Sequence, residues 1–176
     1  DLGTFFRVLI EEATRCRGAH RAAVKFPVFP SYIEKLHTWW PEARVVHISR
    51  DPRSIAASKT NDPGGTQKLI KRFPALRGLL PHIGMWFAVL QYVWASKAHA
   101  RMAGRRGYRL FLYEDLMQHP ESTVRELCEF CELEFDESML NPAAGQASSV
   151  TGLKTAGFDP SRMHGWQAQL KPWQSR

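Results

Sequence analysis

Residues 44–59 read RVVHISRDPRSIAASK, and this stretch decides the fold. The β-branched run at residues 44–49 predicts a strand that is covered on both faces. Asp51 and Pro52 follow it, and they suit the N-cap and the first position of a helix that continues to Lys59. A buried strand that leads directly into a helix is typical of the parallel sheet of an α/β fold.

Helical and strand-like segments alternate along the rest of the chain. Apolar residues at helical spacing predict helices over residues 4–17, 30–40, 81–103 and 120–133, with a short one near residues 165–170. Two β-like runs predict further strands at residues 20–26 (HRAAVKF) and 108–113 (YRLFLY). Residues 61–80 contain glycines and prolines and are expected to be mostly irregular. Strands separated by helices imply a three-layer α/β sandwich with a central parallel sheet.

The composition is that of a globular protein and excludes a disordered tail or a fibre, since 44% of the 176 residues are hydrophobic and 23% are charged. Three cysteines are too few for a disulfide framework. Cys128 and Cys131 lie in a helical pattern, so we expect buried or half-buried thiols there and no metal site. The unpaired cysteines favour a reducing, cytoplasmic location. A net charge of +7 suits an anionic partner without specifying one.

The most apolar run, residues 83–95, is shorter than the roughly 20 residues that a bilayer requires, so no membrane span is expected. Trp86, Leu90 and Trp94 stand four residues apart in this run. Such an apolar stripe favours a helix face packed in the core.

The carboxyl end of the strand expected at residues 44–49 gathers groups that suit an anion. Arg50 stands at this end, where ligands of open α/β sheets bind. The following helix directs its dipole at the same place, and Arg53 lies in its first turn. Ser54 and Ser58 share one helix face. These groups fit a phosphate monoester, and the alternative is a well-capped turn that carries surface arginines.

The motif SRDPRSIAAS at residues 49–58 resembles the 3′-phosphate-binding motif of sulfotransferases that use 3′-phosphoadenosine 5′-phosphosulfate (PAPS). In that family an arginine at the strand end and a serine eight residues later hold the 3′-phosphate, and Arg50 and Ser58 have this spacing. The sequence YEDL at residues 113–116, with Pro120 after it, is similar to a family stretch whose tyrosine lies at the adenine pocket. The resemblance therefore implies a nucleotide-kinase-like fold, in which Arg50, Ser58 and Tyr113 bind the nucleotide.

Two further segments extend the resemblance. The sequence KFP at residues 25–27 matches an upstream family motif, and residues 162–166 are similar to the C-terminal basic segment that folds over the 3′-phosphate. Arg162 and Gly165 would complete the phosphate clamp. The family's phosphosulfate loop should precede these motifs, and no counterpart is seen. The resemblance thus implies that residues 1–176 form one partial sulfotransferase-like domain, truncated before the first strand and its loop.

The activity that the resemblance implies is transfer of a sulfuryl group from PAPS to a hydroxyl or amine. The acceptor would be a carbohydrate, a lipid or a small metabolite, the product adenosine 3′,5′-bisphosphate, and no metal is implied. Lys25 matches a family lysine that approaches the sulfuryl group, and the alternative is a strand-end lysine in solvent. His20 is a candidate for the catalytic base. His47, inside a strand, is expected to be a core histidine bonded to its neighbours.

Several alternatives stay open at this stage. The basic residues at 61–80 indicate either a lid that binds the acceptor or a solvated loop. A non-catalytic module that binds adenosine 3′,5′-bisphosphate is one rival function, and a basic nucleic-acid-binding domain is another. The second rival is disfavoured, because the positive residues are scattered and no nucleic-acid motif is present. The acceptor, the base and the oligomeric state are not determined by the sequence.

Overall fold

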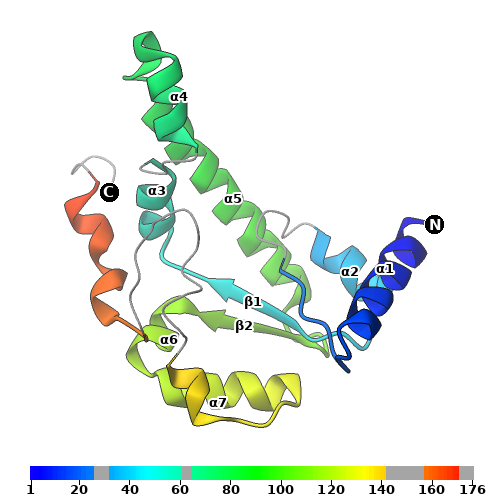
Figure 1. Ribbon diagram of the computed structural model, residues 1–176. Helices are drawn as coiled ribbons and strands as arrows, with labels where there is room; N and C mark the ends of the chain where they lie inside the picture. The colour runs from blue at the N-terminus through cyan, green and yellow to red at the C-terminus, as the bar shows by residue number, and fades with distance from the viewer. Residues whose placement is uncertain (26–31, 61–64, 142–156, 171–176) are drawn as a thin grey trace.

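The computed structural model describes residues 1–25, 32–60, 65–141 and 157–170, apart from the side chain of Arg162. Within these residues two strands form the sheet, β1 (Val45–Ser49) and β2 (Tyr108–Leu112) (Figure 1). They pair in parallel, with Val45 opposite Tyr108 and Ser49 opposite Leu112. The expected α/β fold with a parallel sheet is confirmed.

The described residues contain seven α-helices. They are α1 (Leu2–Cys16), α2 (Ile33–Trp39), α3 (Pro52–Thr60), α4 (Thr66–Arg72), α5 (Leu80–Met102), α6 (Tyr113–Gln118) and α7 (Pro120–Cys131). The described residues also contain four short 3-10 helices, η2 (Pro74–Leu76), η3 (Glu137–Leu140), η4 (Pro160–Met163) and η5 (Gly165–Ala168). Each helix and strand that the sequence predicted outside residues 20–26 has a counterpart, with bounds shifted by a few residues.

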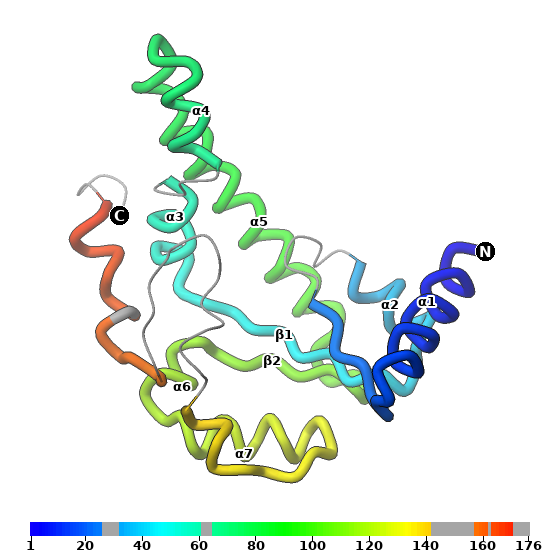
Figure 2. Tube along the Cα trace, viewed as in Figure 1, coloured from blue at the N-terminus to red at the C-terminus, as the bar shows by residue number. Residues whose placement is uncertain are grey.

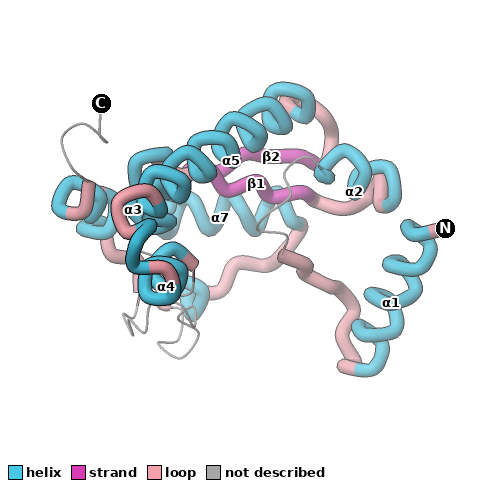
Figure 3. Tube along the Cα trace, turned by 90° about the horizontal axis from the view of Figure 1, so that it is seen from above, coloured by secondary structure: helices cyan, strands magenta, loops and turns pink. Residues whose placement is uncertain are grey.

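Helices cover both faces of the sheet, as Figure 3 shows with α5 on one side and α7 on the other. On the α5 side, Met102 is fully buried in a cluster with Ile33, Ala98 and Tyr108. On the α7 side, the rings of Phe111 and Phe130 lie 6.4 Å apart. The described elements therefore form the three layers that the alternation of strands and helices predicted.

Two expectations about secondary structure are wrong. Residues 20–25 form no strand and are exposed, and Phe26 lies outside the described residues. A strand needs a neighbour for its backbone groups, whereas this segment is tied to a helix end through the side chain of Arg21. Residues 66–76, expected to be irregular, instead form α4 and η2. Helix α4 carries no buried residue, so the sequence offered no strong apolar periodicity there.

The apolar stripe of α5 does not lie in the core. Trp86, Leu90 and Trp94 are 62%, 48% and 52% exposed. Figures 1 and 2 show that the first half of α5 extends past the sheet, whereas Trp94 is exposed although it belongs to the later half, which packs on the sheet. The buried residues of the helix are the small Ala88 and Ala98 and the terminal Met102. Despite its hydrophobicity, neither α5 nor any other helix among the described residues meets the requirements for crossing a bilayer.

The cysteines follow the sequence prediction. Cys128 is buried and Cys131 half-buried, both as free thiols in α7. Burial is the leading cause that raises the pKa of the Cys131 thiol above its ordinary value. A buried thiol of raised pKa is mostly protonated at neutral pH and behaves as a packing group.

A polar cluster lies between α5 and the sheet. The Tyr108 hydroxyl is 2.6 Å from Nδ1 of His47 and 3.0 Å from Nδ1 of His99. It can donate a proton to one imidazole and accept one from the other. His47 is thus a half-buried histidine bonded to its neighbours, as expected. The two histidines also line a cavity of about 160 Å³ with Ser49 and Ser96.

The surroundings of this cluster disfavour a charged imidazole. Burial lowers the pKa of His47, and the nearby His99 lowers it further. Burial also raises the pKa of Tyr108 to about 12, so its hydroxyl stays protonated and available as a donor. These surroundings therefore favour the neutral form of His47.

Stability should decline in mild acid because of His47. Below the ordinary histidine pKa of 6.5, the unfolded chain binds a proton that the folded chain resists, so the free energy of unfolding falls with decreasing pH. The decline ends once the pH is below the lowered pKa of the folded protein. We expect the midpoint of urea unfolding to fall between about pH 7 and pH 5. His47→Gln should flatten this dependence, whereas replacement of the exposed His119 by Gln should not. Parallel pH curves for wild type and His47→Gln would contradict the assignment.

Candidate functional site

Three segments that are far apart in the sequence meet at the carboxyl ends of the two strands. Arg50 follows β1, Tyr113 begins α6 directly after β2, and the segment of η4 and η5 packs against α3 and α6. Figure 1 shows this last segment beside α3. Ligands of open parallel sheets bind at such an edge. The structure thus gathers three of the sequence motifs that were predicted to act together.

The Arg50 guanidinium lies over the ring of Tyr113, with 4.2 Å between its central carbon and the ring centroid. Both residues are half-buried. The parallel register brings them together, because Ser49 and Leu112, the residues before them, are paired across the sheet. A planar guanidinium that is held against an aromatic face is fixed in direction and suits recognition of a phosphate.

Asp51 caps helix α3. Its carboxylate accepts a hydrogen bond of 2.8 Å from the backbone N–H of Arg53. The same carboxylate accepts three more from the Arg53 guanidinium, and this ion pair has a closest distance of 2.7 Å. These hydrogen bonds, chiefly the one from the Arg53 side chain, lower the pKa of Asp51 below its ordinary value of 3.8. The N-cap predicted from the sequence is confirmed.

A second carboxylate, which sequence reasoning missed, also reaches this turn. Glu114 accepts a hydrogen bond of 2.9 Å from the backbone N–H of Asp51. Its only signal in the sequence was its place beside Tyr113. With Asp51 and Glu114 against Arg50 and Arg53, the turn is balanced in charge. An anionic ligand here must compete with carboxylates, so its affinity rests on the arginine side chains more than on the helix N-terminus.

The C-terminal segment closes over α3. The Arg53 guanidinium lies 4.1 Å from the ring centroid of Trp166. The buried Ser54 hydroxyl donates to the carbonyl oxygen of Met163 over 3.4 Å, a long hydrogen bond. Ser58, one turn further along α3, is exposed. Of the two serines on this face, only Ser58 is therefore open to a ligand.

The remaining clamp candidates lie in this segment as well. Gly165 begins η5, and a Cβ atom added to it would meet only the Gln169 side chain, at an ordinary 3.8 Å. Packing therefore does not demand glycine there, which is consistent with close approach of a ligand to the backbone. The backbone of Arg162 lies in η4, and its side chain lies outside the described part of the structure.

The two catalytic candidates lie elsewhere. His20 and Lys25 belong to the exposed segment between α1 and α2. Beside His20, the Arg21 guanidinium donates to two carbonyl oxygens at the C-terminal end of α7, at 2.8 and 3.0 Å. One of them belongs to Glu132, whose carboxylate pairs with Arg44 just before β1. His20 is thus held near the amino end of the sheet, opposite the nucleotide candidates. Lys25 is further along this segment, which turns back toward the sheet in Figure 1.

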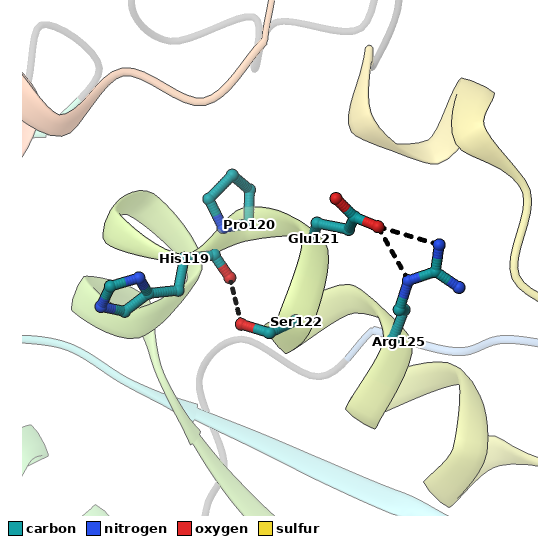
Figure 4. A pocket seen from close by; sticks show the side chains of 5 residues that line it. All are labelled: His119, Pro120, Glu121, Ser122 and Arg125. Atoms are coloured by element: carbon teal, nitrogen blue, oxygen red, sulfur yellow. Dashed lines mark hydrogen bonds and ion pairs between the residues drawn. The ribbon is translucent and has the colours of Figure 1, made fainter.

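An open depression of about 390 Å³ lies where α6 meets α7 (Figure 4). It is lined by His119, Pro120, Glu121, Ser122 and Arg125. Glu121 accepts two hydrogen bonds from Arg125, whose guanidinium also lies 3.8 Å from the ring centroid of Phe135. The charged side chains that line this depression are paired with each other, so we assign the depression no function.

Comparison with known proteins identifies the family and the fold. The model of the sulfotransferase family matches residues 3–137. The chain belongs to the sulfotransferase family. Among relatives of this chain, the sulfotransferase 2B1 of Rattus norvegicus is 26% identical over 116 residues, which are 61% of this chain and 32% of that protein. An uncharacterized protein of Aquifex aeolicus (strain VF5) is 24% identical over 161 residues, 87% of this chain and 19% of that protein.

Two solved sulfotransferase domains share the fold. The domain of the Synechococcus PCC 7002 olefin synthase has a TM-score of 0.57 and 21% identity. The match covers 84% of this chain and 51% of the chain of that domain. The domain from the curacin biosynthetic pathway has a TM-score of 0.59 and 19% identity, over 84% of this chain and 56% of its own. The chain thus spans about half the length of these domains. Family and fold class are those that the sequence motifs predicted.

Removal of the Asp51 cap should destabilise the protein. We expect Asp51→Ala to lower the free energy of unfolding by about 1 kcal/mol, because the cap of α3 is lost. Asp51→Asn keeps a capping oxygen and loses only an ion pair whose arginine is exposed, so it should cost less than about 0.5 kcal/mol. Urea denaturation at neutral pH measures both. The negative charge of Asp51 stabilises the folded state at pH values above the ordinary pKa of an aspartate. This stabilisation is lost as the pH falls through the lowered pKa of the folded protein. An Asn variant as unstable as the Ala variant would show that the ion pair dominates.

Proposed function

We propose that this sulfotransferase uses PAPS as donor and transfers the sulfuryl group to a hydroxyl or amine of a carbohydrate, lipid or small-metabolite acceptor. The observation that carries the proposal is the placement of Arg50 against Tyr113 at the carboxyl ends of parallel strands, in a chain of the sulfotransferase family. An arginine held by an aromatic ring supplies the charge and the flat surface that a nucleotide phosphate and base require.

Each nucleotide-binding residue has a role in the proposal. Arg50 and Ser58 hold the 3′-phosphate, with Ser58 reaching it from the exposed face of α3. Tyr113 contacts adenine with the part of its ring that Arg50 leaves uncovered. Arg162 and Gly165 complete the clamp from the C-terminal segment, which contact with α3 already brings close. No residue in this set acts as a metal ligand.

The reaction itself is an in-line displacement at sulfur. The acceptor oxygen or nitrogen forms a bond to sulfur while the bond from sulfur to the phosphate oxygen breaks, and adenosine 3′,5′-bisphosphate leaves. The acceptor's proton passes to a base. As in phosphoryl transfer, catalysis depends on positioning and on neutralising the transferred group. Lys25 is the proposed cation for the sulfuryl group. For His20 to act as the base, its segment would have to leave the end of α7.

A binding module without activity is the alternative function. The same nucleotide site supports it, because the nucleotide residues and the catalytic candidates lie in different segments. The two functions differ in one measurement. Formation of adenosine 3′,5′-bisphosphate from PAPS in the presence of an acceptor supports the enzyme, and binding of the nucleotide without turnover supports the module.

The donor site is tested by ligand choice. Adenosine 3′,5′-bisphosphate should raise the melting temperature well above the effect of AMP, because only the former carries the 3′-phosphate. Arg50→Ala should weaken its binding by about ten- to a hundredfold, the value of a charged hydrogen-bonded contact, and leave the response to AMP nearly unchanged. Thermal-shift titrations of both nucleotides measure this.

Arg125→Ala is the matched control. Arg125 also lies on an aromatic ring and pairs with a carboxylate, but it lies at the junction of α6 and α7. Its replacement should leave both titrations as in the wild type. Equal stabilisation by the two nucleotides, or none by either, would refute the proposed donor site.

A further inference from the structure

Helix α4, η2 and the first two turns of α5, residues 66–87, project from the molecule, and we call them the arm. Figures 1 and 2 show the arm extending beyond α3, away from the sheet. Two hydrogen bonds fix its base to the last turn of α3. Thr66 Oγ1 donates to the Lys59 carbonyl oxygen over 2.8 Å, and the Gln67 side chain donates to the Thr60 carbonyl oxygen over 3.2 Å. The arm is therefore held in a set direction.

The arm exposes an unusual amount of apolar surface. Seven large apolar side chains on it are between 44% and 62% exposed, namely Leu69, Phe73, Leu76, Leu79, Ile83, Trp86 and Phe87. They are spread along the whole arm, on α4, η2 and α5 and at Phe73 and Leu79 between these helices. Exposed apolar side chains gathered on one projecting segment indicate an interaction site.

The same surface carries positive charges. Lys68, Lys71, Arg72 and Arg77 are exposed among the apolar residues. The sequence contains no aspartate or glutamate from residue 65 to residue 113. This is a property of the segment, because acidic residues are frequent elsewhere and form ion pairs on α1, α3 and α7. The partner of the arm should therefore be anionic.

Charge and apolarity together select one class of partner. A second copy of the chain would bring two basic surfaces together, which is repulsive. A nucleic-acid duplex would satisfy the basic groups but would leave exposed Leu, Ile and Trp side chains without an apolar environment. We propose that the arm docks on the surface of an anionic lipid bilayer. Its basic side chains then lie among the headgroups, while Trp86, Phe87 and Ile83 enter the boundary with the acyl chains.

The placement of the arm gives docking a structural consequence. Helix α3 connects the base of the arm to the turn that carries Arg50 and Arg53. Nine helical residues span about 14 Å at 1.5 Å per residue. A docked arm would therefore hold the candidate nucleotide site at a set height above the membrane surface. Docking itself does not depend on the proposed donor, and it is tested without nucleotide.

Vesicle co-sedimentation of the whole chain tests the proposal. Vesicles of phosphatidylcholine with about one third phosphatidylserine should bind the protein, and vesicles of phosphatidylcholine alone should bind it much less. The triple variant Lys68→Gln, Lys71→Gln, Arg72→Gln should reduce binding about a hundredfold, because each removed charge should reduce it about fivefold. Trp86→Ser should also reduce it, through the apolar contribution.

Matched controls distinguish a specific role of the arm from non-specific effects of positive charge or of exposed apolar side chains. Arg105→Gln with Arg106→Gln removes exposed charges just after the other end of α5. Phe5→Ser removes an apolar side chain on α1 that is 61% exposed, like Trp86. Both controls should bind vesicles as the wild type does. Equal losses in controls and arm variants, equal binding to both kinds of vesicle, or no binding would overturn the proposal. So would binding to a DNA duplex in place of vesicles, or a dimer that Trp86→Ser dissociates.

Discussion

The parallel pairing of β1 with β2 is the interaction on which the rest of the structure depends. Its register sets Ser49 beside Leu112, so the next residues of the two strands, Arg50 and Tyr113, leave the sheet at the same edge. A shift of one residue would move the Arg50 guanidinium by about 3.3 Å and turn alternate side chains to the other face. The stacked pair would then be lost, and so would the alignment of α3 with α6.

Charge balance is the second constraint on the site. Two carboxylates stabilise the turn that carries Arg50 and Arg53: Asp51 pairs with Arg53, and Glu114 accepts a hydrogen bond from the backbone N–H of Asp51. The carboxylates hold the turn in a defined conformation at the expense of affinity for anions. The ring of Tyr113 fixes the direction of the Arg50 guanidinium. Arg53 is bound by Asp51 on one side and covered by the ring of Trp166 on the other.

Local chemistry explains which features could be predicted from the sequence. The strand at residues 45–49, the Asp51 cap and the α3 helix depend on adjacent residues, so a short stretch contained the necessary information. The meeting of Arg50 with Tyr113 was predicted through the family resemblance and not through periodicity. The strand expected at residues 20–26 required a neighbouring strand, which local sequence does not reveal. Glu114 was missed for the same reason, because its role depends on a turn that is distant in the chain.

Helix α5 shows how one periodic pattern serves two environments. Apolar residues occur around its whole circumference, and the sequence alone cannot distinguish a helix enclosed by protein from one that faces another apolar phase. Its later part meets the first condition, since Ala98 and Met102 pack on the sheet with almost no exposed surface. Its first half exposes bulky side chains such as Trp86 and, with α4, carries basic residues without acidic ones. The change of environment along one continuous helix is what makes the arm a separate surface, although the helix binds it rigidly to the core.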